Sequence, residues 1–391
     1  MQKKLFSLML ILVLVAAAFA GCGGGGTEEP AADDSTVKIG INYELTGAVA
    51  TYGQASVDGI MMAIDEINAN GGIDGKQIEV VQGDNKSEPS EATSIATKLI
   101  TQDGVVAILG PATSGNFKAQ EPVCTQNGVP MISASATADD VTVGADGKVK
   151  EFVFRLCFND SFQGTAMANF AARNLSAKNA VIIKDNSSDY GKGLAESFTA
   201  QFTAEGGTIV TEEGYVAKDK DFNAILTNIK GMDFDVIFIP GYYQEAGLII
   251  KQARDLGITA PILGADGFDS PTLLELAGAP ALNNVYFSNH YSSLDQDPAV
   301  VDFIAKYKEK YGKDPDAFNA LGYDLGMFIA DAIQRAGSND PAAIKDALAS
   351  TTEFTGVTGS FSIDENHNPV KSIVVIELKD GAQASSVKVN P

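Results

Sequence analysis

The 391-residue sequence has no tryptophan, two histidines and three cysteines, and its 28 lysine and arginine residues are outnumbered by 50 aspartate and glutamate residues. This excess of negative charge excludes a surface built to bind nucleic acid or anionic lipid headgroups. Three cysteines are too few for a fold held together by disulfides. An exported protein could still pair Cys124 with Cys157, and the sequence leaves a bridge and two free thiols equally open.

The usual motifs for catalysis and nucleotide binding are absent as well. None of the four Gly-Lys pairs is followed by the serine or threonine of a phosphate-binding loop. Ser114 stands in A-T-S-G-N, which is not the G-x-S-x-G turn of a serine nucleophile. His290 and His367 are the only candidates for an imidazole base, and we interpret both as surface or hinge residues. With no C-x-x-C pair, H-x-x-x-H pair or complete calcium loop, we predict a non-enzyme without cofactor or metal.

The first residues predict an export signal. Lys3 and Lys4 precede the apolar run 5–19, which has the length of a secretory signal core and is too short to span a bilayer comfortably. The run ends in F-A-G-C, which resembles the lipobox of bacterial lipoproteins, where cleavage precedes the cysteine and its thiol is acylated. An ordinary signal peptide followed by a structural cysteine is the alternative. We expect residues 1–21 to be removed and Cys22 to anchor the protein, by its lipid, outside the cell membrane.

Residues 22–36 are rich in glycine, proline and acidic residues and are expected to form a flexible tether. Since residues 1–21 contain two lysines and no acidic residue, their removal leaves 370 residues and changes the formal net charge from −22 to −24. Such a chain has no basic patch for the membrane surface. The acyl chain on Cys22 must therefore hold it there.

Beyond the tether, short apolar runs alternate with amphipathic stretches. Residues 54–70, for example, place Val57, Ile60 and Ile64 on one helical face. Alternation of strand and helix every 25 to 35 residues or so indicates parallel sheets with right-handed crossovers. The predicted strands are 37–45, 78–84, 105–110, 130–135, 152–158, 180–185, 208–216, 234–241, 261–267 and 284–291, followed near the C-terminus by a strand pair, 359–364 and 371–379.

The length of the chain predicts two domains, because about 355 ordered residues exceed what one hydrophobic core usually supports. We expect the α/β class, with two doubly wound parallel-sheet lobes joined by a hinge that the chain crosses three times, near residues 158, 288 and 369. Lobe I then comprises 37–158 and 290–368, and lobe II comprises 159–289 and 369–391. Ligands of open parallel sheets bind beyond the carboxyl ends of the strands, so the informative residues should follow the strands.

Small hydroxyl side chains, one acid and several tyrosines follow the predicted strands. Segment 111–116 places Ser114 and backbone N–H groups at a helix N-terminus, where an anion is stabilised. The next strand is followed by the Ser135 carbonyl and the Thr137 hydroxyl, and Asp266 ends a later strand, where it can bind a cation. The tyrosines that stand where strands or loops meet helices are Tyr52, Tyr190 and Tyr242. Together they fit an α-amino acid, whose two charges both need partners on leaving water.

Each of these residues also has a purely structural interpretation. Ser114 could be an ordinary helix N-cap, and Thr137 could cap its own helix. Asp266 could cap the helix that follows 269–271, and the tyrosines could simply fill the edge of the cleft. The combination, in an exported chain without catalytic motifs, favours capture of a ligand over its turnover.

The chain closely resembles the bacterial leucine/isoleucine/valine-binding proteins, the extracytoplasmic solute receptors of branched-chain amino acid ABC transporters. The resemblance runs from about residue 36 to 380 and is carried by segments 46–80, 108–116, 128–137, 186–198, 240–257 and 263–271. It implies a type I periplasmic-binding-protein fold whose cleft closes on the ligand. It also implies that a membrane permease recognises the closed, loaded form.

The resemblance also assigns roles to individual residues. Ser114 and Thr137 would hold the ligand carboxylate, and the Ser135 backbone, Thr137 and Asp266 would hold the ammonium. The side-chain pocket would be lined by Tyr52, Tyr190 and Tyr242, with Tyr243 as an alternative to Tyr242. Two departures leave the preference for leucine itself open: Asp266 replaces the glutamate frequent in the family, and Ser135 replaces a small alanine.

We therefore expect a monomeric, lipid-anchored receptor that captures a free apolar L-amino acid, such as leucine, isoleucine or valine, and delivers it to the permease of an ABC importer. Relatives that bind amides, urea or aromatic carboxylates are one alternative, and such ligands would not need the charge of Asp266. A ligand sensor on the same fold is another. It would be tied to a transmembrane signalling module, and no second apolar span precedes Pro391.

Overall fold

The computed structural model describes residues 36–390; the predicted signal segment, Cys22 and nearly all of the tether lie outside them. In the part of the chain that is described, no helix is long and apolar enough to cross a membrane. Two large sheets, called sheet I and sheet II below, organise these residues.

Sheet I is parallel throughout, with the strand order β2-β1-β3-β4-β5. Its strands are β1 (Thr36–Tyr43), β2 (Gln77–Asp84), β3 (Ala107–Leu109), β4 (Met131–Ser133) and β5 (Val153–Arg155). The crossover helices are α1 (Ala50–Ala69), α2 (Pro89–Thr101) and α3 (Ser114–Asn127). Every residue of β3, β4 and β5 is buried, as expected for strands covered on both faces by helices.

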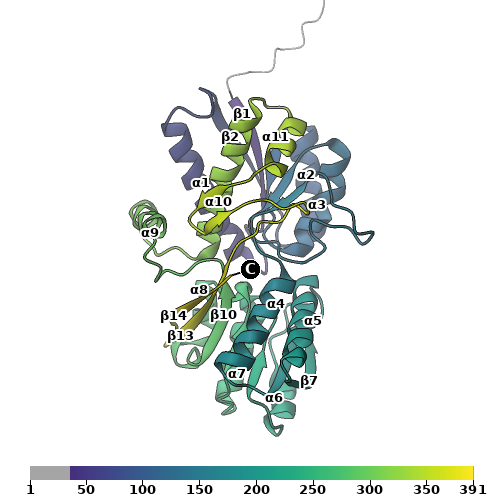
Figure 1. The fold of residues 1–391 in the computed structure, drawn as a ribbon, viewed down its shortest axis with the longest axis vertical. Coiled ribbons are helices and arrows are strands. Elements are labelled where there is room, and N and C mark those ends of the chain that lie inside the picture. The colour runs from purple at the N-terminus through teal and green to yellow at the C-terminus, as the bar shows by residue number, and fades with distance from the viewer. Residues whose placement is uncertain (1–35, 391) are drawn as a thin grey trace, which may run out of the picture. The chain divides into compact units, whose positions relative to one another are not determined.

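Sheet II has the order β14-β13-β10-β9-β8-β6-β7, and its parallel part, β7-β6-β8-β9-β10, repeats the order of sheet I. Its parallel strands are β6 (Asn179–Asp185), β7 (Thr208–Tyr215), β8 (Val236–Phe238), β9 (Ile262–Gly264) and β10 (Val285–Asn289). The helices of this part are α4 (Asp160–Asn169), which continues into a π-helical turn (Phe170–Asn174), α5 (Asp189–Ala204), α6 (Asn223–Lys230), α7 (Tyr243–Asp255) and α8 (Pro271–Ala277). In Figure 1, α1, α2 and α3 lie with sheet I, and α4 to α8 lie with sheet II.

The predicted C-terminal strand pair is wrong. Residues 373–379 form β13, which pairs antiparallel with β10 and with β14 (Ala382–Val389) at the edge of sheet II. The other predicted member contributes β12 (Gly359–Phe361), which pairs instead with β11 (Phe354–Gly356) in a separate hairpin. Alternating apolar residues identified both strands, but a strand's partner depends on contacts that local patterning does not encode.

The chain passes three times between the two sheets. It leaves sheet I after β5 and enters α4, and it leaves sheet II after β10 and runs to α9 (Pro298–Tyr311), α10 (Ala317–Ala336) and α11 (Pro341–Ala349). It returns to sheet II through the segment before β13 (Figure 1). These passages agree with the expected three-crossing hinge. We propose that the lobes divide as the sequence suggests, with α9 to α11 and the β11–β12 hairpin in lobe I.

Helices α1 and α10 pack closely in lobe I because glycines stand at their contact. A side-chain carbon on Gly59 would collide with the backbone of Asn319, and one on Gly322 would collide with the backbone of Ser56. A capping box, in which Asp316 and Asn319 bond reciprocally, begins α10, and Gly337 ends it with a φ of 60°.

Cys124 and Cys157 are both buried free thiols, so the structure contains no bridge between them.

Candidate functional site

The predicted site residues meet at the carboxyl ends of both sheets, where the strand order reverses in each. A small cavity of about 10 Å³ lies there. Six of the seven predicted ligand-binding residues line it: Tyr52, Ser114, Ser135, Tyr190, Tyr242 and Asp266. Ala112, Thr113, Gly267 and Phe318 complete the lining. The space holds about one water molecule, so a ligand the size of an amino acid enters only if the lobes separate or the tyrosines move.

On the lobe I side, Ser114 is the first residue of α3, and Thr113 rather than Ser114 occupies the N-cap position. The Ser114 hydroxyl is buried and accepts a hydrogen bond from the Ala138 N–H at 3.1 Å. Ser135 lies beside it and donates from its hydroxyl to the Ala112 carbonyl at 3.0 Å. These bonds join the loop after β3 to the loop after β4.

The expectation that the backbone N–H groups of 111–116 face a ligand needs correction, because Glu44 already uses two of them. Its buried carboxylate accepts from the N–H of Ala112 at 2.9 Å and of Thr113 at 3.2 Å, and from the Thr113 hydroxyl at 2.8 Å. Asn116 Nδ2 donates to the same carboxylate at 2.8 Å. Glu44 thus places its own carboxyl group at the α3 N-terminus, and the Ser114 hydroxyl remains among the groups of this segment that line the cavity.

Thr137 does not line the cavity, in contrast to its predicted role in binding the carboxylate. It is fully buried, its hydroxyl has no hydrogen-bond partner among the described residues, and its carbonyl accepts from the Asp160 N–H at 2.9 Å. Buried Arg155 donates to the same carbonyl at 2.9 Å and to Asn368 Oδ1 at 2.6 Å. The backbone of Thr137 thus supports the site, and the role of its hydroxyl in binding a carboxylate stays a prediction.

Four aromatic rings from both lobes surround the cavity. Tyr52 stacks on Phe318 with ring centroids 4.3 Å apart, and Tyr190 stacks on Tyr242 at 5.1 Å. The Tyr52 hydroxyl donates to the Gly267 carbonyl and accepts from the Tyr243 N–H at 3.3 Å, which connects lobe I to lobe II. Tyr242, not Tyr243, lines the cavity. Aromatic walls of this kind suit an apolar side chain.

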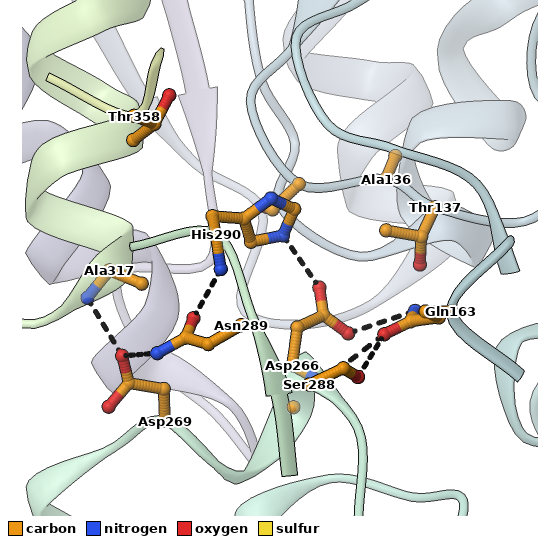
Figure 2. Close-up of polar contacts among 12 residues, drawn as sticks. Ala136, Thr137, Gln163, Asp266, Asp269, Ser288, Asn289, His290, Ala317 and Thr358 are labelled. Carbon is orange, nitrogen blue, oxygen red and sulfur yellow. Dashed lines mark hydrogen bonds and ion pairs between the residues drawn. The ribbon is translucent and has the colours of Figure 1, made fainter. Parts of the chain in front are cut away.

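Asp266 is the centre of a buried polar network, shown in Figure 2. Its Oδ1 accepts from the Tyr190 hydroxyl at 2.7 Å and from Gln163 Nε2 at 3.2 Å, and its Oδ2 lies 3.1 Å from His290 Nε2. Gln163 is held in turn by the Ser288 hydroxyl, which donates to its Oε1 at 2.8 Å. Three neighbours therefore fix the direction of this carboxylate, and a carboxylate can accept a further bond from a cation.

A second acid, Asp160, stands beside this network. Gln163 Nε2 donates to Asp160 Oδ1 at 2.9 Å and so lies between the two carboxyl groups. Burial, and then the negative charge of Asp266, raise the pKa of Asp160 well above its ordinary value. Burial also lowers the pKa of His290, although Asp266 opposes this shift. Burial therefore favours the protonated form of Asp160 and the neutral form of His290.

The sequence analysis missed several residues of this arrangement. His290 is not at the surface but 4% exposed, in the hinge segment after β10, and Gln163 comes from α4 just after the first crossing. No local motif points to either, because their role depends on Asp266, which is distant in sequence. Phe318 could have been suspected as an aromatic residue in the first turn of a helix, α10. Glu44 could have been suspected as an acid that ends an apolar strand.

Residues 36–390 contain no cluster of three or more histidine, cysteine or acidic side chains that could hold a metal ion.

Comparison with known proteins shows the family to which the chain belongs. Residues 36–383 match the family described as periplasmic binding protein. The chain belongs to this family. The resemblance seen in the sequence is thereby confirmed, and so is the expected fold class.

Two relatives of this periplasmic binding protein illustrate the match. The chain is 34% identical over 333 residues to the Leu/Ile/Val-binding protein BraC3 of Rhizobium johnstonii. That alignment covers 84% of this chain and 88% of the relative. It is 31% identical over 336 residues to the leucine-, isoleucine-, valine-, threonine-, and alanine-binding protein of Pseudomonas aeruginosa, which covers 86% of this chain and 87% of the relative.

Solved structures of periplasmic binding proteins have the same fold as this chain. The branched-chain amino acid transporter substrate binding protein LivJ of Streptococcus pneumoniae, in complex with isoleucine, has a TM-score of 0.87 at 45% identity, covering 91% of this chain and all of that one. The leucine binding protein LivK of Thermotoga maritima has a TM-score of 0.86 at 39% identity, covering 91% and 99%. An R. palustris solute binding protein in complex with benzoate, at 24% identity and a TM-score of 0.81, shares the fold.

Proposed function

We propose that this protein is the extracytoplasmic substrate-binding lipoprotein of an ABC importer and captures a free apolar L-amino acid, most specifically a branched-chain one. One observation carries the proposal: Asp266 is an oriented, buried carboxylate at one side of a cavity whose other side presents Ser114 and whose walls are aromatic. The ligand names of the relatives with more than 30% identity support the same class of ligand.

The two charges of the ligand find separate partners in this proposal. The ammonium pairs with Asp266 and with the Ser135 carbonyl. The carboxylate accepts from the Ser114 hydroxyl, whose oxygen keeps the bond that it accepts from the Ala138 N–H. Tyr52, Tyr190, Tyr242 and Phe318 then cover the side chain. Each charged group is desolvated against a group that compensates it, which a closed cleft requires.

Closure is the signal to the transporter. Tyr52 of lobe I bonds Gly267 of lobe II, and Lys118 of lobe I bonds Asp189 of lobe II at 2.7 Å, so the closed arrangement has its own stabilising contacts. A ligand that touches both lobes adds to them and shifts the population toward the closed form. The permease recognises that form and receives the amino acid, and the receptor acts as a monomer.

The localisation in this proposal rests on the sequence of residues 1–35. Cleavage before Cys22 and acylation of its thiol would place the receptor on the outer side of the cell membrane, tethered by residues 22–36. Replacing Cys22 with serine is expected to move the exported protein from the membrane fraction to the soluble fraction without changing its ligand binding. Retention of the Cys22→Ser variant in the membrane fraction would contradict the anchor.

Thermal-shift measurements on the ligand-stripped protein test the ligand class. We expect leucine, isoleucine or valine to raise the melting temperature, and urea, acetamide and benzoate to leave it unchanged. Stabilisation by benzoate and not by any amino acid would favour an aromatic carboxylate receptor, the alternative known from a more distant structural neighbour. That result would overturn the proposal.

A further inference from the structure

A second cavity, of about 310 Å³, lies next to the chain segments of the hinge and is called the hinge cavity below. It is enclosed by the loop from β10 to α9, the β11–β12 hairpin and the segment at the start of β13. None of the residues that line it also lines the cleft cavity. Its buried end is formed by His290, Thr358 and Lys371, each at most 6% exposed.

Lys371 brings a cation to the buried end of this hinge cavity. Its Nζ donates to the Thr358 hydroxyl at 2.6 Å and to the Leu156 carbonyl at 3.3 Å. The Thr358 hydroxyl donates its own hydrogen to Asp324 at 2.6 Å, so the lysine and that acid are bridged rather than paired directly. An ammonium group has three hydrogens, and these contacts use two of them.

His290 brings an unpartnered polar atom to the same end. Its Nε2 faces Asp266, but its Nδ1 is buried and has no hydrogen-bond partner among the described residues. Figure 2 shows this second ring nitrogen pointing away from Asp266. Buried polar atoms without a partner are rare, because their loss of hydration is not compensated.

The sign of the charge inside the cavity selects the ligand. Asp295 and Asp297 stand in the exposed loop at its mouth, and each already accepts a backbone N–H: Asp295 from Asp297 at 3.0 Å and Asp297 from Ala299 at 2.9 Å. The buried end offers the Lys371 ammonium group as a donor, and His290 Nδ1 becomes a second donor once the ring is protonated, so an acceptor ligand complements both.

We propose that the hinge cavity is a second ligand site, which takes a small organic carboxylate between the ammonium group of Lys371 and Nδ1 of His290. One carboxylate oxygen accepts the third ammonium hydrogen and the other accepts from Nδ1. His290 then needs a proton on both ring nitrogens, one for Asp266 and one for the ligand, so one proton enters with each anion. The charged groups that act on the ring are Asp266, from the loop after β9, and Lys371.

The two sites are linked through His290. The imidazolium formed on anion binding pairs with Asp266 and repels a cation beside it. If the proposed function is correct, the carboxylate weakens amino acid binding in the cleft, and the amino acid weakens carboxylate binding by the same factor. This consequence rests on the proposed function, whereas the existence of the second site does not.

The test uses the fact that the sequence has only two histidines. The full mature chain, labelled with ¹⁵N-histidine and free of amino acids, is titrated at pH 7 with sodium propionate against sodium chloride at constant ionic strength, and His367→Asn assigns the signals. We expect a saturable shift of the His290 Nδ1 signal toward the protonated position, with the His367 signals unchanged. An unchanged His290 signal would overturn the proposal.

Three variants locate the site. Lys371→Met should weaken propionate binding about tenfold or more, because a charge-assisted hydrogen bond is lost. Thr355→Trp, which fills the exposed mouth and leaves the lysine in place, should also abolish the shift. Ser114→Ala should retain it, since that hydroxyl lies in the cleft. A shift that survives Thr355→Trp, or that disappears in Ser114→Ala, would contradict a hinge site even if Lys371→Met failed to fold.

Discussion

His290 Nε2 lies 3.1 Å from Asp266 Oδ2, and both side chains are almost fully buried. This contact joins the hinge segment after β10 to the acid that we propose for the ligand ammonium. Tyr190 and Gln163 hold the other oxygen of the carboxylate, so its orientation is set before a ligand arrives. Such preorganisation reduces the entropy that binding has to spend on ordering side chains.

Asp266→Asn should reduce the affinity for leucine by roughly 2–5 kcal/mol, because the ligand ammonium would be buried without its counter-charge. Isothermal titration calorimetry measures this loss directly. Asp233→Asn, at an exposed position, is the matched control and should bind like the wild type. Equal affinities of Asp266→Asn and the wild type would show that the ligand carries no ammonium group at this site.

Gly267→Ala should impair binding without unfolding the protein. A Cβ at this position would lie 2.9 Å from the Gly241 carbonyl oxygen, 3.0 Å from the Tyr190 hydroxyl and 3.2 Å from the Tyr52 hydroxyl, so the aromatic walls must shift. Overpacking of this kind costs about 1–3 kcal/mol. Gly231→Ala, where nothing lies within 4 Å of the added carbon, is the control. Calorimetry measures the ligand affinity of both variants, and thermal unfolding measures their stability. Equal ligand affinities of Gly267→Ala and Gly231→Ala would refute the explanation.

Lys118→Met should destabilise the closed form. Lys118 Nζ lies 2.7 Å from carboxylate oxygens of Asp140 and Asp189, and only the Asp189 contact crosses from lobe I to lobe II. Its side chain is 18% exposed, so we expect a loss of about 1 kcal/mol in ligand affinity, reduced at high salt. Lys98→Met, which breaks the exposed pair with Asp103 within lobe I, should leave the affinity unchanged. A similar loss in both variants would contradict a role in closure.

The buried Lys371 predicts a pH dependence of stability. Burial lowers its pKa from 10.5 to about 8 in the folded protein. Between pH 8 and 10.5 the unfolded chain therefore holds a proton that the folded chain has released, and the free energy of unfolding rises with pH. Relative to that of Lys371→Met, the free energy of unfolding of the wild type should rise by up to about 3 kcal/mol over this pH range. Urea unfolding followed by circular dichroism at pH 7.5 and pH 10 measures the difference, and a constant difference would exclude the shift.

Much of the fold follows from local patterns. The apolar runs that became β1, β3, β8 and β9 are short and bounded by turn residues, and the alternation with helices implies parallel pairing. The partners of β13 could not be predicted in this way. Alternation shows which face of a strand is apolar, but the strand's neighbours in the sheet are set by tertiary contacts with β10 and β14.

The candidate site could be predicted where a residue lies between a strand and the next helix or in the first turn of that helix. Ser114, Ser135 and Asp266 and the three predicted tyrosines do so, and all six line the cavity. Thr137 comes soon after a strand too, yet it does not line the cavity, and Arg155 and the Asp160 N–H fix its backbone. The supporting residues Gln163 and His290 became evident only from distances across the chain, since each acts through Asp266 rather than through a motif of its own.

The claim at the centre of this account is that the cleft binds a zwitterion through two separate charge partners. The most direct test is calorimetry of the ligand-stripped protein with leucine and with 4-methylpentanoate, which has the same carboxylate and side chain but no ammonium group. We predict that leucine binds at one site, at least about a hundredfold more tightly than 4-methylpentanoate. If the preferred ligand is isoleucine or valine, the same difference is expected between that amino acid and its own deaminated analogue. Equal affinities for the amino acid and its analogue would contradict the account.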